Sequence, residues 1–600
     1  MAVELNIIFL IAVAIIFKTY YIDKEEPWVS HLNTTYDYII VGAGSAGCVL
    51  ANRLSESANV TVLVLEAGGS DVGDPLIDTP GYAPLTLKTD IDWAYYSEPQ
   101  RDVMGGLKDG RSFWPRGKVV GGSGSVNAMI YARGSRHDYD RWAKYMGVPD
   151  WNYQHVLPYF NKMENVLIKG LEDSDYRGHD GPITVNHIEP HPIVEKLVEA
   201  AKAVGYPDNQ DYNGRSMEGV FNAQVNSNSG ERWSTAKAYL HPVLDRSNLH
   251  VAIHSHVTKV VIKNKECKGV EVIRNGRKYM IQARKEVILS AGTVGSAHIL
   301  MLSGVGPQQH LESHKISVVA NLPVGENLQD HLFFDVGVQI KEPLSATRNS
   351  FSSLWSHLMY KLFGTGPMSS PFLLESLAFK STTKETREMD WPDLQLGFTS
   401  ALPSGVLLDK FGYNEEVKAE MAGRDVADYG FACLPCLTRP ESRGLISLRS
   451  NDPFDYPVIQ ANYLKRQEDI ELLIRGINEC KKMLQTKTMM KLGAELTERT
   501  IPAVCASYKY DSHEYWQCLV KRRPLTMYHP VGTCKMGPPG DATAVVDPQL
   551  RVQGIGGLRV VDASIMPWIV SANPQAAVVM IAEKSADMIL GKTPMQPLQL

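Results

Sequence analysis

Near the start of the chain, two apolar runs enclose a glycine-rich turn. The first run, Asp37–Val41, leads directly into Gly42-Ala-Gly-Ser-Ala-Gly47, and the second, Val60–Leu65, ends at Glu66. Apolar runs bounded by turn residues predict buried strands, with a helix between them that begins in the glycine turn. In such a unit the glycines permit a tight turn, backbone approach to a pyrophosphate and close helix packing, while the acidic residue accepts hydrogen bonds from a ribose. The pattern predicts a dinucleotide site and fits NAD as well as FAD.

A second glycine-rich stretch lies at 117–134. Its first nine residues, Gly117–Ser125, contain four glycines and two serines, which suits a backbone that lies against a flat ligand or holds phosphate oxygens. The alternative is a flexible surface loop. Apolar residues within and after it, such as Val119, Val126 and Ile130, favour a buried loop that contacts a ligand.

A third candidate site comes late in the chain, where His529 begins the run His-Pro-Val-Gly-Thr-Cys534 and Asn573 precedes a helix-like run to Ile589. An alcohol carbon gives up hydride as its hydroxyl loses a proton, so a base must lie beside the oxygen. Histidine titrates near neutrality, and an asparagine amide donates a hydrogen bond at any pH. Asn573 also fits a helix cap before Pro574, and both roles are compatible. Cys534 is expected to pack, yet it lies near His529 and is the cysteine to test for reactivity.

Length and composition describe a large globular chain. Its 600 residues exceed what one core usually serves, so we expect two domains, or one α/β domain with an elaborated second lobe. Charged residues make up 21% and the net charge is -5, with no basic stripe, so no nucleic-acid partner is expected.

The cysteines and histidines do not predict a metal site. Eight cysteines at irregular spacing do not form a disulfide scaffold, and Cys433-Leu-Pro-Cys436 is interpreted as structural or disulfide-bonded. His187-Ile-Glu-Pro-His191 has the wrong spacing for a zinc helix, and His254 and His256 lack a nearby third ligand and fit a surface strand.

The N-terminus carries an unbroken apolar run at Ile7–Phe17. Eleven residues are short for a membrane span but suit the apolar core of a secretory signal, which is the preferred interpretation. Glu4 before the run and the lack of a small-residue cleavage site keep an uncleaved membrane-holding segment open. Glycosylation sequons at Asn33 and Asn59 would be used only in the secretory pathway.

Together these segments resemble the glucose-methanol-choline (GMC) oxidoreductases, flavoenzymes that oxidise alcohols. The resemblance runs from about Tyr36 to Leu590, and the runs at 117–140 and 292–306 look like the two family signatures. Runs at 325–331 and 440–448 are also family-like, and the pattern is similar to animal members of the glucose dehydrogenase and choline dehydrogenase type. Ala297 stands where the family usually has proline, a difference that touches no chemistry.

The resemblance implies a residue set for FAD. The catalytic histidine of the family matches His529, and its second catalytic position, histidine or asparagine, matches Asn573. Trp114 stands where some relatives attach flavin through a histidine, so non-covalent FAD is expected, and no metal. The implied cofactor-binding residues are Gly42, Gly44, Ser45, Ala46, Gly47, Glu66, Ala67, Trp114, Val120, Gly121, Gly122, Ser123, Asn127, Ala128, Met129, Val257, Asp562, Ala563, Asn573, Pro574 and Gln575.

The expected fold class is α/β, with a Rossmann-like FAD-binding domain interleaved with an antiparallel-sheet (α+β) substrate-binding domain. The expected segments are a signal peptide or membrane anchor at 1–22, an FAD-binding region at 36–331 with 190–250 partly in the substrate lobe, a mainly substrate-binding region at 332–525, and a C-terminal return at 526–590 that carries the catalytic pair.

The expected reaction is oxidation of a small-molecule alcohol, with electrons passed to a quinone-like acceptor or oxygen. Two alternatives stay open: a hydroxynitrile lyase, because a few relatives use bound FAD without redox, and a secreted flavoprotein scaffold without activity. The presence of His529 and Asn573 argues against the scaffold. The sequence does not choose the alcohol, the acceptor or the oligomeric state.

Overall fold

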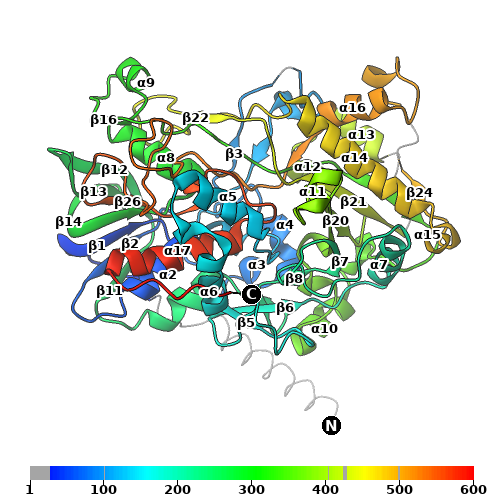
Figure 1. Cartoon of the computed structure of the whole chain (residues 1–600), viewed down its shortest axis with the longest axis horizontal. Helices are drawn as coiled ribbons and strands as arrows, with labels where there is room; N and C mark the ends of the chain where they lie inside the picture. Colours follow the sequence, from blue (N-terminus) through cyan, green and yellow to red (C-terminus); the bar gives the residue numbers. More distant parts are fainter. Residues whose placement is uncertain (1–26, 101, 403–404, 423–428, 498–500, 600) are drawn as a thin grey trace, which may run out of the picture.

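A computed structural model describes residues 27–100, 102–402, 405–422, 429–497 and 501–599. The apolar run at 7–17 lies outside these residues. Figure 1 shows two lobes, one built around the strands near the N-terminus and the other around strands from the middle of the chain.

The first lobe contains a seven-stranded sheet. Five strands run parallel, in the order β11 (Leu249–Ala252), β2 (Val62–Leu65), β1 (Thr35–Val41), β14 (Arg277–Leu289) and β26 (Leu558–Val560), and β13 (Glu266–Arg274) and β12 (Ser255–Lys263) continue from β14 as antiparallel neighbours. Residues Val62–Leu65 are all buried, as expected of parallel strands covered on both faces. Helices α2 (Ser45–Leu54) and α17 (Gln575–Leu590) pack against one another beside this sheet, although their sequences lie over 500 positions apart (Figure 1).

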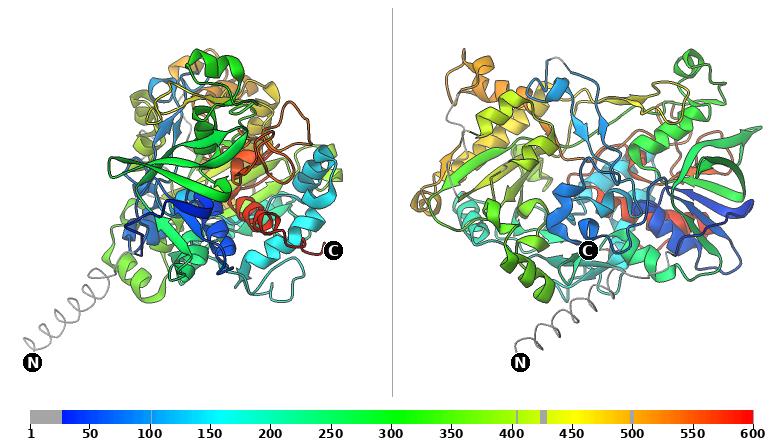
Figure 2. Two further views of the ribbon diagram at one scale, coloured as in Figure 1. Left: turned by 90° about the vertical axis from the view of Figure 1, so that its left-hand side faces the viewer. Right: turned by 180° about the vertical axis from the view of Figure 1, so that it is seen from behind.

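The second lobe contains an eight-stranded sheet whose recorded pairings are all antiparallel. Its main order is β24 (Glu495–Leu496), β18 (Val336–Ile340), β21 (Tyr429–Leu437), β20 (Leu394–Thr399), β19 (Leu374–Lys380) and β7 (Gly219–Asn222). Strand β17 (Leu332–Phe333) also pairs with β21, and β25 (Leu525–Thr526) pairs with β17. Helix α14 (Gln467–Leu484) packs against β20 and β21. The two lobes are seen from behind in Figure 2.

A disulfide ties α14 to this sheet. Cys433 on β21 bonds Cys480 on α14, and Cys505 bonds Cys518. The expected structural or disulfide role therefore holds for both residues: Cys433 is disulfide-bonded and Cys436 is a buried free thiol. The two cysteines of the Cys-x-x-Cys run are not partners of each other, because they lie on an extended strand rather than in a turn.

The predicted fold class is confirmed: a mixed α/β lobe with a glycine turn after its first strand is combined with an antiparallel second lobe. The chain crosses between the lobes more than once, because β7 enters the second sheet long before β17 and the chain returns to the first sheet at β26. Over the described ranges, every helix is too short or too polar to span a bilayer.

Candidate active site

A cavity of about 690 Å³ is lined by residues of both lobes. Its walls include the end of β1, the start of α2, the start of β12, strands of the second sheet, and the C-terminal residues that carry His529 and Asn573. Cavities of this size bind small molecules and cofactors. The segments that the sequence singled out as separate glycine-rich and polar motifs therefore meet at one place.

The glycine turn after β1 is shaped by close backbone contacts. Gly42 has φ +98°, and a Cβ there would lie 2.6 Å from the carbonyl oxygen of Ser290. Gly122, in the second glycine-rich loop, has φ +56°, and its Cβ would lie 2.7 Å from the Cα of Gly44. A side chain at Gly122 would therefore separate the two glycine-rich loops, and a side chain at Gly42 would push the turn away from Ser290, so both positions require bare backbone.

Glu66 lies at the end of β2, where the ribose-binding residue was expected. Its two carboxylate oxygens accept hydrogen bonds from the backbone N–H groups of Ala43 (2.9 Å) and Gly68 (2.8 Å). Burial raises the pKa of Glu66 above its ordinary value. The carboxylate thus holds the turn in place and also lines the cavity.

Most of the predicted cofactor-binding residues line this cavity: Gly42, Gly44, Ser45, Ala46, Glu66, Ala67, Gly122, Ser123, Asn127, Ala128, Met129, Val257, Asp562, Ala563, Asn573, Pro574 and Gln575.

Four predicted residues, Gly47, Trp114, Val120 and Gly121, do not line it, so the structure differs from the expected direct contact. A Cβ at Gly47 would lie 1.9 Å from the carbonyl oxygen of Gly42, so this glycine serves the close packing of α2. The Trp114 ring is buried and stacks on Tyr463 with centroids 6.4 Å apart. Val120 is buried, and the Gly121 N–H donates to the Ala43 carbonyl (2.7 Å), so these two residues join the second loop to the first.

The backbone of His529 is fixed by a buried carboxylate. Asp330 accepts a hydrogen bond from the His529 backbone N–H (2.9 Å) and two more from the hydroxyls of Tyr463 (2.5 Å) and Thr526. Burial raises the pKa of Asp330 to about 6, and the three donors oppose that rise. Arg116 donates to the backbone carbonyl of Tyr528 (2.5 Å), so the peptide before His529 is held as well.

The hydrogen bonds of the two histidine rings define which nitrogen of His529 carries the proton. His331 Nε2 lies 2.9 Å from the backbone carbonyl of Thr438, which only accepts, so Nε2 is protonated. Burial lowers the pKa of His331 to about 4, so the ring is neutral near pH 7 and its Nδ1 is an acceptor. His529 Nδ1 lies 3.0 Å from that atom and must donate to it. In neutral His529 the unprotonated nitrogen is therefore Nε2.

Asn573 lies on the Nε2 side of His529. Its Nδ2 is 3.3 Å from His529 Nε2, and its Oδ1 accepts from Gln395 Nε2 (3.4 Å), which orients the amide. The predicted helix cap is wrong: Pro574 occupies the capping position of α17 and no side chain caps that helix. The Asn573 amide turns instead toward the cavity that it lines with His529.

Burial also lowers the pKa of His529 well below its ordinary value, with His331 and Arg116 adding to the effect. The imidazole is neutral at pH 7. A neutral imidazole whose Nε2 is unprotonated and lies at a cavity wall can accept a proton from a bound hydroxyl.

Four non-glycine residues of the cavity wall have left-handed backbone conformations: Met129 (φ 59°), Phe372 (φ 55°), Leu373 (φ 54°) and Tyr528 (φ 63°). Such conformations are strained for residues with a Cβ and gather at functional sites. Tyr528 directly precedes His529, so the strain lies beside the candidate base.

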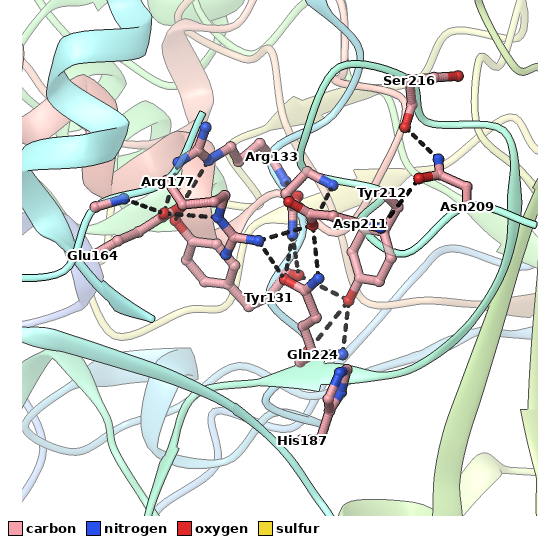
Figure 3. A network of polar contacts seen from close by, with 12 residues as sticks. Tyr131, Arg133, Glu164, Arg177, His187, Asn209, Asp211, Tyr212, Ser216 and Gln224 are labelled. Carbon is pink, nitrogen blue, oxygen red and sulfur yellow. Dashed lines mark hydrogen bonds and ion pairs between the residues drawn. The ribbon is translucent and has the colours of Figure 1, made fainter. Parts of the chain in front are cut away.

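The segment that follows the second glycine-rich loop is anchored by a buried ion network, shown in Figure 3. Glu164 pairs with Arg133 (2.6 Å) and Arg177 (3.0 Å), and Arg177 also pairs with Asp211 (2.8 Å). Tyr131 donates to Glu164 as well. Arg133 and Tyr131 lie just beyond Met129, so the network holds the far end of the segment that lines the cavity.

Sequence reasoning did not assign roles to Asp330, His331, Gln395 or Arg116. Asp330 and His331 belong to the family-like run at 325–331. An acidic residue next to a histidine in that run was the signal that could have pointed to them. Gln395 comes from β20, and nothing in its local sequence points to Asn573.

Cys534 is not a reactive cysteine. Its thiol is fully buried, and burial raises its pKa far above the ordinary value, so thiolate is scarce at neutral pH. His256 is also more enclosed than a surface strand implies, because it is partly buried and lines the cavity. Within the described residues, no cluster of three or more metal-ligating side chains is found.

The glycine turn after β1, Glu66 after β2 and the cavity between the lobes are features of an α/β protein that binds a dinucleotide. Comparison with protein-family models agrees. The N-terminal GMC oxidoreductase model matches residues 36–333, and the C-terminal GMC oxidoreductase model matches residues 440–582. The chain belongs to the GMC oxidoreductase family.

Known relatives are similar over most of the chain. Glucose dehydrogenase [FAD, quinone] of Drosophila melanogaster is 38% identical over 94% of this chain and 90% of its own length. Mitochondrial choline dehydrogenase of Homo sapiens is 38% identical over 93% of this chain and 90% of its own length. Among solved structures, pyridoxine 4-oxidase from Mesorbium loti superposes with a TM-score of 0.78 at 27% identity, covering 93% of this chain and 100% of its own.

The residues present fit FAD, the cofactor of this family. A Cβ at Gly44 would have no protein atom closer than 3.9 Å, so the bare backbone there leaves room for a close ligand. Ser290 Oγ and His298 Nε2 are buried atoms of cavity-lining residues without a hydrogen-bond partner in the protein. Buried polar atoms are normally satisfied, so these two atoms point to a polar ligand. The glycine turn, Glu66, Ser290 and the loop at Gly122–Met129 would hold it.

Proposed function

We propose that this protein oxidises a small alcohol at the wall formed by His529 and Asn573, with non-covalent FAD as the hydride acceptor. The observation that carries the proposal is a one-way chain of hydrogen bonds in which Asn573 donates to His529, His529 donates to His331, and His331 donates to the Thr438 carbonyl. It leaves His529 Nε2 unprotonated at the cavity wall.

The side chains divide the reaction between them. His529 Nε2 takes the proton of the substrate hydroxyl, and the Asn573 amide donates to the substrate oxygen and so fixes its position. As the O–H proton leaves, the C–H bond breaks with its electron pair and a carbonyl forms. Bound FAD supplies the two-electron acceptor for that hydride. Asp330 keeps the His529 backbone from shifting during the transfer.

The substrate is proposed to have an apolar body. On the second-lobe part of the cavity wall, Asp335 Oδ1 pairs with buried Arg523 and also accepts from Tyr413. The charge of Arg523 offsets that of Asp335 and so disfavours a cationic substrate there. The rest of that wall is largely aliphatic and aromatic: Phe333, Phe372, Leu373, Leu374, Leu402, Leu407, Phe411 and Leu434.

The electron acceptor is proposed to be a quinone. This rests on the printed names of relatives, such as glucose dehydrogenase [FAD, quinone]. Oxygen is the alternative, because other structural relatives are named oxidases. Rapid reoxidation of the reduced enzyme by a soluble quinone, with slow reoxidation in air, would support the quinone.

Anaerobic mixing with a panel of alcohols tests the reaction. Bleaching of the flavin absorbance by an apolar alcohol supports the proposal. If no alcohol bleaches the flavin while a cyanohydrin is cleaved, the protein is a lyase instead. Acid precipitation of the protein should release all of the flavin into the supernatant, since Trp114 cannot form the histidyl link; flavin that stays with the pellet would contradict non-covalent binding.

We propose that the protein enters the secretory pathway, where segment 1–22 is cleaved as a signal or is kept as a membrane anchor. Support comes from the apolar run at 7–17, from two disulfides, and from the exposure of Asn33 and Asn59 in their sequons. Glycosidase treatment should increase gel mobility, and mass spectrometry of the mature N-terminus decides between the two fates.

A further inference from the structure

Helix α10 (Leu354–Phe363) turns an apolar face outward. Leu354 is 84% exposed, Trp355 66%, Leu358 45%, Leu362 63% and Phe363 65%. Leu354, Leu358 and Leu362 recur every four residues and so form one stripe, with Trp355 beside it. Large side chains exposed together in this way mark a surface that contacts something apolar.

The opposite face of α10 is attached to the protein. Tyr360 and Ser356 are buried, and the Tyr360 hydroxyl donates to the backbone carbonyl of Asp78 (3.5 Å). His357 lies 3.1 Å from the Tyr82 hydroxyl. The helix is thus held in a fixed orientation with its apolar stripe outward, at the lower edge of the molecule in Figure 1.

The charge of the segment that carries the stripe suits a lipid surface, and the neighbouring exposed Glu231 is paired with Lys237 (3.4 Å). Residues 343–374 contain no aspartate or glutamate, and α10 itself carries Lys361 as its cation. Anionic headgroups would meet no carboxylate from this segment, and tryptophan prefers the membrane interface. The polar residues that flank the stripe are serines and Lys361. A protein–protein contact is usually surrounded by a rim of polar residues, and these residues supply little of such a rim.

The helix also leads directly to the cavity. After Phe363 the chain passes through Gly364 and Gly366 to Phe372 and Leu373, which line the cavity in strained conformations. The first of these cavity residues, Phe372, therefore comes ten positions after Leu362, the last residue of the stripe.

We propose that α10 is a membrane-surface helix whose apolar stripe inserts into the headgroup region of a lipid bilayer. It lies in the interface and does not span it. One consequence, which rests on the proposed function, is that a lipophilic alcohol or quinone can pass between the bilayer and the cavity along the loop after α10.

Site-specific fluorescence tests this placement in the full chain. The four free cysteines, Cys48, Cys267, Cys436 and Cys534, are all buried, so a cysteine introduced at an exposed position is labelled selectively. Leu358→Cys carries a polarity-sensitive dye on the stripe. Leu167→Cys, at another exposed apolar residue (53%), is the matched control. Vesicles of equal amounts of phosphatidylcholine and phosphatidylserine should shift the emission of the dye at 358 to the blue and leave the dye at 167 unchanged.

A binding measurement completes the test. The triple variant Leu354→Ser, Leu358→Ser, Leu362→Ser should partition onto the same vesicles at least about tenfold more weakly than Leu167→Ser, because it removes most of the stripe. Both variants should keep their flavin spectrum, which shows that they fold.

Two outcomes overturn the proposal. If the protein binds vesicles but the dye at 358 does not respond, the contact is made by another part of the chain, such as the run at 7–17. If that dye shifts without vesicles and in step with protein concentration, a second copy covers the stripe. Neither outcome bears on alcohol oxidation, which the flavin bleaching test reports separately.

Discussion

His529 is set apart from the other histidines by the direction of its hydrogen bonds. The Thr438 carbonyl fixes the proton of His331, His331 fixes the proton of His529, and the remaining nitrogen lies beside Asn573 at the cavity wall. A single backbone oxygen thus defines the base without a charged partner on the ring. The position of the ring is set separately, through Asp330 and the His529 backbone.

Replacing His529 by alanine should slow flavin reduction by about 10²-fold or more, on the usual scale for the loss of a positioned base. FAD should stay bound, because its proposed contacts lie mainly on the glycine turn and the second loop. Stopped-flow absorbance measures the rate, and the flavin to protein ratio measures retention. His513→Ala, at an exposed histidine that does not line the cavity, is the control and should change neither the rate nor the flavin to protein ratio. Loss of FAD from His529→Ala would contradict the assigned role.

The pH dependence of flavin reduction follows from the low pKa of His529. A base works in its unprotonated form, and its activity is lost as pH falls through its pKa. Because the pKa is held well below the ordinary 6.5, the rate should be level from about pH 8 to 6.5 and should fall only at lower pH. An acid limb with its midpoint at or above about 6.5 would show that burial does not perturb His529 in the loaded enzyme.

At the scale of elements, local sequence predicted the parts whose shape is set by near neighbours. Asp37–Val41, the glycine turn and Glu66 could be recognised because strand, turn and helix positions follow each other within thirty residues. His331, Gln395 and the pairing of Cys433 with Cys480 could not, because each depends on strands and helices that meet only in the folded second lobe. Asn573 was ambiguous for the same reason: a cap is a local choice, whereas its contact with His529 spans the fold.

The buried ion network of Figure 3 joins the segment after the second glycine-rich loop to the three-stranded sheet β5 (Glu164–Val166), β6 (Ile183–His187) and β8 (Gln224–Val225). Glu164 sits between two arginines that are 0–1% exposed. Its ion pairs hold its pKa below the ordinary value despite burial, so the carboxylate is charged and compensates both guanidinium groups.

Glu164→Gln should therefore destabilise the protein by about 3–5 kcal/mol, since it leaves buried arginine charge uncompensated. Because the network holds the end of the cavity-lining segment, FAD should also bind more weakly. Thermal unfolding and flavin release on dilution measure the two effects. Glu172→Gln, at an exposed glutamate nearby, should change neither. Equal behaviour of the two variants would show that the network does not support the loop.

At the scale of the whole molecule, the two disulfides of the described residues both belong to the second lobe. Both disulfides lie in the segment 433–518, which contains helix α14 of the second lobe. Cys48, Cys267 and Cys534 are buried thiols outside this segment, and Cys436 is a buried thiol within it. Burial raises the pKa of each of these four thiols. Low thiolate content and exclusion from solvent both suppress reaction with alkylating agents.

The native, flavin-loaded protein should accordingly resist alkylation at all four free cysteines, and all four should react once it is unfolded without a reductant. Mass spectrometry of peptides from the unreduced protein should show Cys433 joined to Cys480 and Cys505 joined to Cys518. Alkylation of Cys534 in the native protein would show that this cysteine near His529 is reactive, and it would contradict the burial described above. A Cys433–Cys436 bond would instead break the link between β21 and α14. Because β21 pairs with β20 at Gln395, such a rearrangement should also disturb the residue that orients Asn573 and slow flavin reduction.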